Sequence, residues 1–84
     1  MDHLARTARQ IGAVVRRERK RQRLSQAQLG EQIHRRQATI SKLEAGEPGT
    51  QLQTLLDVLA ALDLELVIRP RTKASTVEIE EAVR

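Results

Sequence analysis

Residues 24–46 read LSQAQLGEQIHRRQATISKLEAG, and this stretch predicts two short helices joined by a tight turn. The first helix starts after Ser25, a good N-cap, because Gln28 three residues later completes a capping box. In such a box each of the two side chains bonds the backbone N–H of the other residue. Leu29 and Ile33, four residues apart, then give this helix one apolar face.

The helical pattern breaks at residues 34–36 and resumes over residues 37–44, with Gly46 as a C-terminal stop. Ile40 and Leu43 are the apolar residues of this second helix, and their spacing of three predicts the face that meets the core. The turn between the helices is therefore only a few residues long.

The remaining surface of the second helix is short, polar and mostly uncharged, whereas ordinary solvent-facing helices prefer Glu and Lys. Glutamine can pair bidentately with adenine, and alanine or a threonine methyl can pack on thymine. Basic side chains beside them can contact phosphates. The residues that would meet DNA are Arg35, Arg36, Gln37, Ala38, Thr39, Ser41 and Lys42. The plainer alternative is an ordinary polar helix in a small bundle.

The run LSQAQLGEQI and the following QATISKLEAG resemble the helix-turn-helix of the phage Cro/C1 repressor (Xre) family, over about residues 11–62. The residues that carry the resemblance are Leu24, Ser25, Gln26, Leu29, Ile33, Ile40, Leu43, Glu44 and Gly46. Two positions depart from the family pattern: Gly30 stands where Ala is usual, and His34 stands where the turn Gly is usual. Gly30 preserves a close helix–helix approach, and His34 must tolerate a left-handed or otherwise strained turn, which it does better than a β-branched residue.

The resemblance implies an all-α, lambda-repressor-like bundle of four to five helices. It also implies that Gln26 hydrogen-bonds a DNA phosphate and braces the recognition helix. In the family, an arginine late in the first helix pairs with the glutamate that closes the recognition helix. The matching residues here are Arg19 and Glu44.

Charge and composition agree with a partner that is duplex nucleic acid. Residues 1–42 hold eleven Lys and Arg against three acidic residues, a net +8, whereas residues 43–84 carry a net −4. A basic half that contains the motif is the electrostatic footprint of a DNA binder, and an acidic half suggests a protein partner. Since the chain has no Phe, Tyr or Trp, base stacking on aromatic side chains, the usual device of single-strand and RNA binders, is excluded.

Several other classes of protein find no support in the sequence. The 84 residues fit one small domain, without cysteine for a disulfide or thiolate metal site. His3 and His34 have no ligand-like neighbours, and no catalytic set or glycine-rich phosphate loop is visible. We therefore expect neither an enzyme nor a metal or cofactor site. The apolar runs are too short for a transmembrane segment, and no signal peptide is visible, so we expect a cytoplasmic protein.

Two more helices flank the motif. The first spans residues 4–23, or starts as late as Thr7 as its N-cap. Its basic end, residues 16–23, reads mostly as a solvated face. The last helix starts at residue 49 or 50 and runs through residue 62, with an apolar face wider than one core requires.

Residues 64–69, LELVIR, alternate as a β-strand does, and Pro70 ends the run. A single strand in a helical chain has no sheet to join, so we expect a homodimer in which two copies pair antiparallel. The dimerisation residues would be Leu64, Leu66, Val67 and Ile68. The alternative is a short extension of the preceding helix. The chain thus divides into a domain over residues 1–69 and a flexible tail over residues 70–84.

Within the family, this plan of one helix-turn-helix, a dimerising strand and a short tail is most similar to the HipB-type antitoxins. That resemblance implies a homodimeric repressor that binds duplex operator DNA, autoregulates its operon and restrains a HipA-like Ser/Thr kinase toxin. A stand-alone repressor of the Xre family without a toxin is one alternative. A protein-interaction module that no longer binds DNA is the other.

Overall fold

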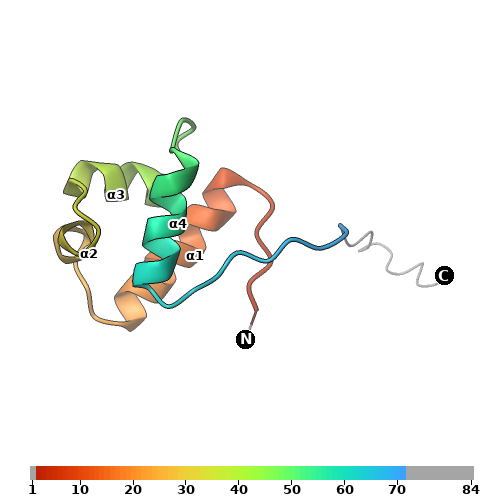
Figure 1. Cartoon of the computed structure of the whole chain (residues 1–84), viewed down its shortest axis with the longest axis horizontal. Coiled ribbons are helices and arrows are strands. Elements are labelled where there is room, and N and C mark those ends of the chain that lie inside the picture. Colours follow the sequence, from red (N-terminus) through yellow and green to blue (C-terminus); the bar gives the residue numbers. More distant parts are fainter. Residues whose placement is uncertain (1, 72–84) are drawn as a thin grey trace.

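Four α-helices form the regular structure of the chain. The computed structural model describes residues 2–71. Its helices are α1 (Ala8–Arg21), α2 (Gln26–Gln32), α3 (Gln37–Ala45) and α4 (Leu52–Ala61). Helix α3 packs against both α1 and α2, and α2 also contacts α4 (Figure 1). Over the described residues the fold is all-α, with four helices and no strand.

The helix starts are set by side-chain caps. The Thr7 side chain accepts a hydrogen bond from the Gln10 backbone N–H at 3.1 Å, so the later of the two expected starts of α1 is correct. At α2 the capping box is confirmed: the Gln28 N–H donates to Ser25 Oγ at 3.0 Å, and the Ser25 N–H donates to Gln28 Oε1 at 2.8 Å. These bonds satisfy N–H groups that have no partner within the helix.

Three of the four helices end on a left-handed residue that is not glycine. Arg23, His34 and Asp63 have φ values of 61°, 58° and 61°, and Gly46 after α3 has 77°. At the turn between α2 and α3, the Arg35 N–H donates to the Gly30 carbonyl at 2.8 Å, which is the long bond of a Schellman motif. The left-handed turn expected at His34 is confirmed.

The core lies where the four helices meet. Its buried apolar members are Val15, Leu29, Ile40, Leu43, Val58, Leu59 and Leu62. Helices α1 and α3 cross closely at Gly12, where an added Cβ would lie 2.5 Å from the carbonyl oxygens of Leu43 and Glu44. At Gly30 an added Cβ would lie 2.6 Å from the Arg35 carbonyl oxygen, so the close contact there is with the turn between α2 and α3 and not, as was expected, with another helix.

Residues 64–71 form neither a helix nor a strand and follow as an open stretch of chain directly on the left-handed turn at Asp63 (Figure 1). The Leu64 N–H donates to the Leu59 carbonyl at 2.7 Å, which ends α4, so the alternative of a longer helix is wrong. The segment has no strand partner among the described residues of this single chain, and its pairing across a dimer stays a prediction. Of the expected tail over residues 70–84, residues 72–84 lie outside the described part. No helix of the described part is long and apolar enough to span a membrane.

Candidate nucleic-acid interface

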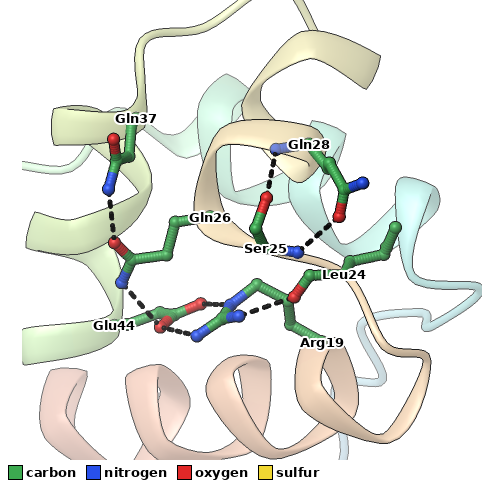
Figure 2. Close-up of polar contacts among 7 residues, drawn as sticks. All are labelled: Arg19, Leu24, Ser25, Gln26, Gln28, Gln37 and Glu44. Atoms are coloured by element: carbon green, nitrogen blue, oxygen red, sulfur yellow. Dashed lines mark hydrogen bonds and ion pairs between the residues drawn. The ribbon is translucent and has the colours of Figure 1, made fainter.

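A buried ion pair joins the end of α1 to the end of α3. Arg19 Nε donates to Glu44 Oε2 at 2.6 Å, and Arg19 Nη2 donates to Glu44 Oε1 at 3.0 Å (Figure 2). The third nitrogen, Nη1, donates to the Leu24 carbonyl at 2.7 Å. The side chains of Arg19 and Glu44 are 8% and 3% exposed, so little water competes for these bonds. The pair holds the C-terminal end of α3 against the end of α1.

Gln26, the first residue of α2, extends this network to the start of α3. Its Nε2 donates to Glu44 Oε1 at 3.1 Å, and its Oε1 accepts from Gln37 Nε2 at 3.3 Å (Figure 2). The network therefore holds both ends of α3, through Glu44 at its last turn and Gln37 at its first residue. Side chains that are locked in this way keep the outer face of α3 in one orientation.

The outer face of α3 is free of such bonds apart from Gln37. The exposed side chains on this face are Arg36, Gln37, Ala38, Ser41 and Lys42. Ile40, Leu43 and Glu44 point the other way and are buried. The helical period therefore places the apolar residues and the ion-paired Glu44 on the inner face of α3, and the short polar residues on its outer face. No side chain caps the N-terminus of α3.

Arg35 and Thr39 lie apart from this exposed face. Both are half-buried, beside the N-terminal end of α4. Arg35 Nη2 is 3.6 Å from Asp57 Oδ2 on α4, and its Nε is buried without a hydrogen-bond partner. In the single chain Arg35 therefore pairs with Asp57 of α4, whereas Arg36 is exposed.

The basic end of α1 divides into exposed and buried members. Arg16, Arg17, Lys20, Arg21 and Arg23 are exposed, whereas Glu18 and Arg19 are buried. Glu18 accepts from Arg21 Nη2 at 2.8 Å and lies 3.7 Å from His3 Nε2. The hydrogen bonds from Arg21 hold the pKa of the Glu18 carboxyl below its ordinary value, and Arg21 has its own pKa raised by the same bonds. This acid therefore stays ionised inside a basic surface.

A family model for the helix-turn-helix domain matches residues 10–78 of the chain. The chain belongs to this family. It is a helix-turn-helix protein of the Cro/C1 (Xre) type and is similar to HipB. No curated protein sequence matches it significantly.

Three solved structures give the likeness to HipB. A HipB variant in complex with an O2 20mer matches with a TM-score of 0.79 and 25% identity, over 86% of this chain and all 100% of that one. HipB in a HipB-O4 20mer complex and in a HipA-HipB-O2-O3 complex match with TM-scores of 0.78. In both cases the identity is 24%, over 84% of this chain and 100% of the other, so these two matches show the fold.

In this helix-turn-helix protein, α2 and α3 are the two helices of the motif, and α3 occupies the place of the recognition helix. The domain is of a non-enzymatic class. Among the described residues, no group of three or more His, Asp or Glu side chains could hold a metal ion.

Two features of this site could not be derived from the local sequence pattern. The pairing of Arg35 with Asp57 joins residues of different helical units, and no local pattern announces it. The hydrogen bond between Gln26 and Gln37 was foreshadowed only by the family, in which the glutamine of α2 braces the recognition helix.

Proposed function

We propose that the helix-turn-helix protein reads duplex operator DNA with α3 in the major groove. Gln37, Ala38 and Ser41 would meet base edges, while Thr39 and Lys42 would touch the sugar–phosphate backbone. The observation that carries the proposal is the contrast between the two faces of α3. Its inner face is fixed by the Arg19–Glu44 pair, and its outer face is exposed, short and polar. Short polar side chains of this kind can reach base edges, whereas an ordinary solvent-facing helix would carry Glu and Lys.

Three side chains around α3 would position the protein on the backbone. Gln26 would hydrogen-bond a phosphate from the first turn of α2 while it braces Gln37. Arg36 is exposed just before α3 and would reach a base or a phosphate. Arg35 would contact a phosphate by leaving Asp57, which is 3.6 Å from it and only partly buried. These contacts would set the register of α3 along the groove.

The active form would be a homodimer that reads two half-sites about one helical turn apart, or a multiple of that spacing. Residues 64–69 would pair with the same residues of a second copy, through Leu64, Leu66, Val67 and Ile68. Val67 and Ile68 are 68% and 90% exposed in the single chain, which is a high exposure for apolar side chains. A second copy that covers these two side chains would remove their apolar surface from water, which stabilises the dimer.

The likeness to HipB supports an antitoxin role. HipB has been solved in complex with an O2 20mer and in a HipA-HipB-O2-O3 complex, and these structures match 86% and 84% of this chain. We infer that this chain restrains a HipA-like Ser/Thr kinase toxin, represses and autoregulates its own operon, and works in the cytoplasm. The acidic second half of the chain, with a net −4 over residues 43–84, offers the surface that is not needed for DNA.

The test of DNA reading is Gln37→Ala on a duplex selected from a random pool by the unmodified protein. We expect a loss of about 1–3 kcal/mol on the selected duplex and much less on random duplex. Gln32→Ala is the matched control, because Gln32 is exposed at the end of α2 and is not among the residues proposed to contact DNA. Equal losses on both duplexes would contradict base readout by Gln37.

Two further measurements separate the alternatives. A DNA binder loses affinity steeply between about 50 and 200 mM salt, whereas an interaction module without DNA binding would show no such complex at either concentration. A pull-down from native cells with a tagged chain tests the toxin: a stoichiometric kinase partner supports the antitoxin role. A homodimer that binds DNA and brings down no kinase identifies a stand-alone repressor.

A further inference from the structure

The last described segment has a charge pattern that mirrors itself. Residues 63–71 read DLELVIRPR. The even-numbered positions are all apolar, namely Leu64, Leu66, Ile68 and Pro70. The odd-numbered positions are two acids, a valine and two arginines, namely Asp63, Glu65, Val67, Arg69 and Arg71. Reversing the direction of the segment about Val67 therefore exchanges every acid for a base.

This segment is unpaired in the single chain. Figure 1 shows it leaving the end of α4 and running away from the four helices. Leu64 still packs against the core, but Leu66, Val67 and Ile68 are 52%, 68% and 90% exposed. In an extended chain successive side chains point to opposite faces, so Leu66 and Ile68 share the face of Leu64.

We propose that this segment pairs antiparallel with its own copy in one fixed register, with the two-fold axis at Val67. The inference rests on the homodimer proposed above and adds the register and the residues that select it. Glu65 then lies opposite Arg69 of the partner subunit, and Arg69 lies opposite the partner's Glu65. Leu66 lies opposite the partner's Ile68 on the other face. Cross-strand pairs of opposite charge and of apolar side chains both stabilise such a ladder.

Other registers lose these pairs. A slip of one residue sets the odd-numbered residues of one strand opposite the even-numbered residues of the other. The two copies of Leu64 then point to opposite faces of the ladder, so the two helical bodies could not lie on the same side of it. A two-residue slip that centres the axis on Leu66 sets Glu65 opposite the partner's Val67. The opposite slip, with the axis on Ile68, sets Val67 opposite the partner's Arg69. Both leave the Glu65–Arg69 ion pairs unmade.

The helical body has a groove that could receive the partner's strand beyond the two-fold axis. A groove of about 640 Å³ lies between the N-terminal residues 2–6 and the segment itself. Its floor is apolar and comes from α1 and α4, through Ile11, Val14, Leu55 and Leu59. With the axis at Val67, Ile68 of the partner subunit would lie beside Leu66, which lines this groove. The 90% exposure of Ile68 in the single chain is thereby explained.

Cysteine cross-linking of the full chain tests the register, since the natural chain has no cysteine. A residue on the axis faces its own copy at a Cα–Cα distance of about 4.5–5.5 Å, within the range of a disulfide. Val67→Cys should therefore form a covalent dimer on mild oxidation. In Leu66→Cys and Ile68→Cys the two cysteines would be more than about 7 Å apart, too far for a bridge. These two variants are the matched controls, and faster cross-linking in either would overturn the register.

Charge reversal gives an independent test by sedimentation. Glu65→Arg and Arg69→Glu should each weaken the homodimer by about 10- to 100-fold, because two attractive pairs become repulsive. An equimolar mixture of the two variants should dimerise again, since each chain then offers the charge that the other lacks. Glu31→Arg is the control, as Glu31 is exposed on α2 and away from the segment. A mixture no tighter than the single variants would contradict the pairing.

Sedimentation and cross-linking together distinguish a wrong homodimer from a wrong register. If the unmodified chain sediments as a monomer, the homodimer of the proposed function is wrong and the register falls with it. If it sediments as a dimer but Val67→Cys does not cross-link, the homodimer stands and the register is wrong. Cross-linking at Val67 together with recovery in the charge-swapped mixture supports both.

Discussion

Arg19 and Glu44 lie 25 residues apart in the chain and form a bidentate ion pair with an Nε–Oε2 distance of 2.6 Å. Both side chains are buried, and each has a further partner: Arg19 donates to the Leu24 carbonyl, and Glu44 accepts from Gln26. The pair thus joins α1, the start of α2 and the end of α3 at one point (Figure 2). Removing either partner would leave the other as an uncompensated buried charge.

Arg19→Met and Glu44→Met should each lower the free energy of unfolding by about 3–5 kcal/mol for this reason. The double variant should lose clearly less than the sum, because two apolar side chains leave no buried charge. Urea unfolding of the four proteins gives the coupling energy, which we expect to be about 1–3 kcal/mol. A coupling near zero would show that the pair does not hold α1 to α3.

His34→Gly should stabilise the protein. His34 has a φ of 58°, a conformation that costs a residue with a Cβ about 1–2 kcal/mol, part of which glycine loses again in chain entropy. The net gain should be about 0.5–1 kcal/mol by urea unfolding. His34→Ala is the control, because it removes the imidazole but keeps the strained φ, and it should give no gain. A gain in His34→Ala as large as in His34→Gly would contradict the backbone explanation.

Gly12→Ala should destabilise the protein although alanine is the better helix former. The added Cβ would lie 2.5 Å from two backbone carbonyl oxygens of α3, so α1 and α3 must separate. Overpacking of this kind costs about 1–3 kcal/mol, more than the gain of up to about 1 kcal/mol in helix propensity. As a control, Ala13→Gly on the exposed side of α1 should cost only about 0.5–1 kcal/mol. Thermal unfolding that shows a more stable Gly12→Ala would refute the close approach.

Acid should remove a stabilising interaction at Glu18. Because Arg21 lowers the pKa of Glu18 in the folded protein, the folded state binds its proton less readily than the unfolded chain. The contribution is therefore complete above the ordinary glutamate pKa of about 4.3 and is lost as the pH falls through the lowered folded value. Urea unfolding of the natural protein and of Glu18→Gln at pH 7 and pH 3 should show a smaller pH dependence in the variant. Parallel losses would contradict a role for Glu18.

The local signals in the sequence were enough to place the two helices of the motif, whereas α4, which no side chain caps, starts at Leu52 and not at residue 49 or 50 as expected. The capping box at Ser25, the left-handed turn at His34 and the stop at Gly46 all involve contacts within a few residues, so their chemistry is visible in the sequence itself. The outer face of α3 follows for the same reason, because the helical period fixes which side chains share a face. The start of α1 was ambiguous because its first turns carry too few apolar residues to separate a helix from an extended segment.

Contacts between distant segments needed the tertiary structure. The ion pair of Arg35 with Asp57, the burial of Glu18 within a basic run and the close crossing at Gly12 depend on how the helices pack, and no periodicity encodes them. The sequence by itself thus determined the four helices, the motif and the surface that α3 presents, since short-range backbone and capping energetics decide these. Only the tertiary structure decided which charged side chains hold the helices together. Burial and ion pairing between residues far apart in the chain arise only when the helices pack around the core.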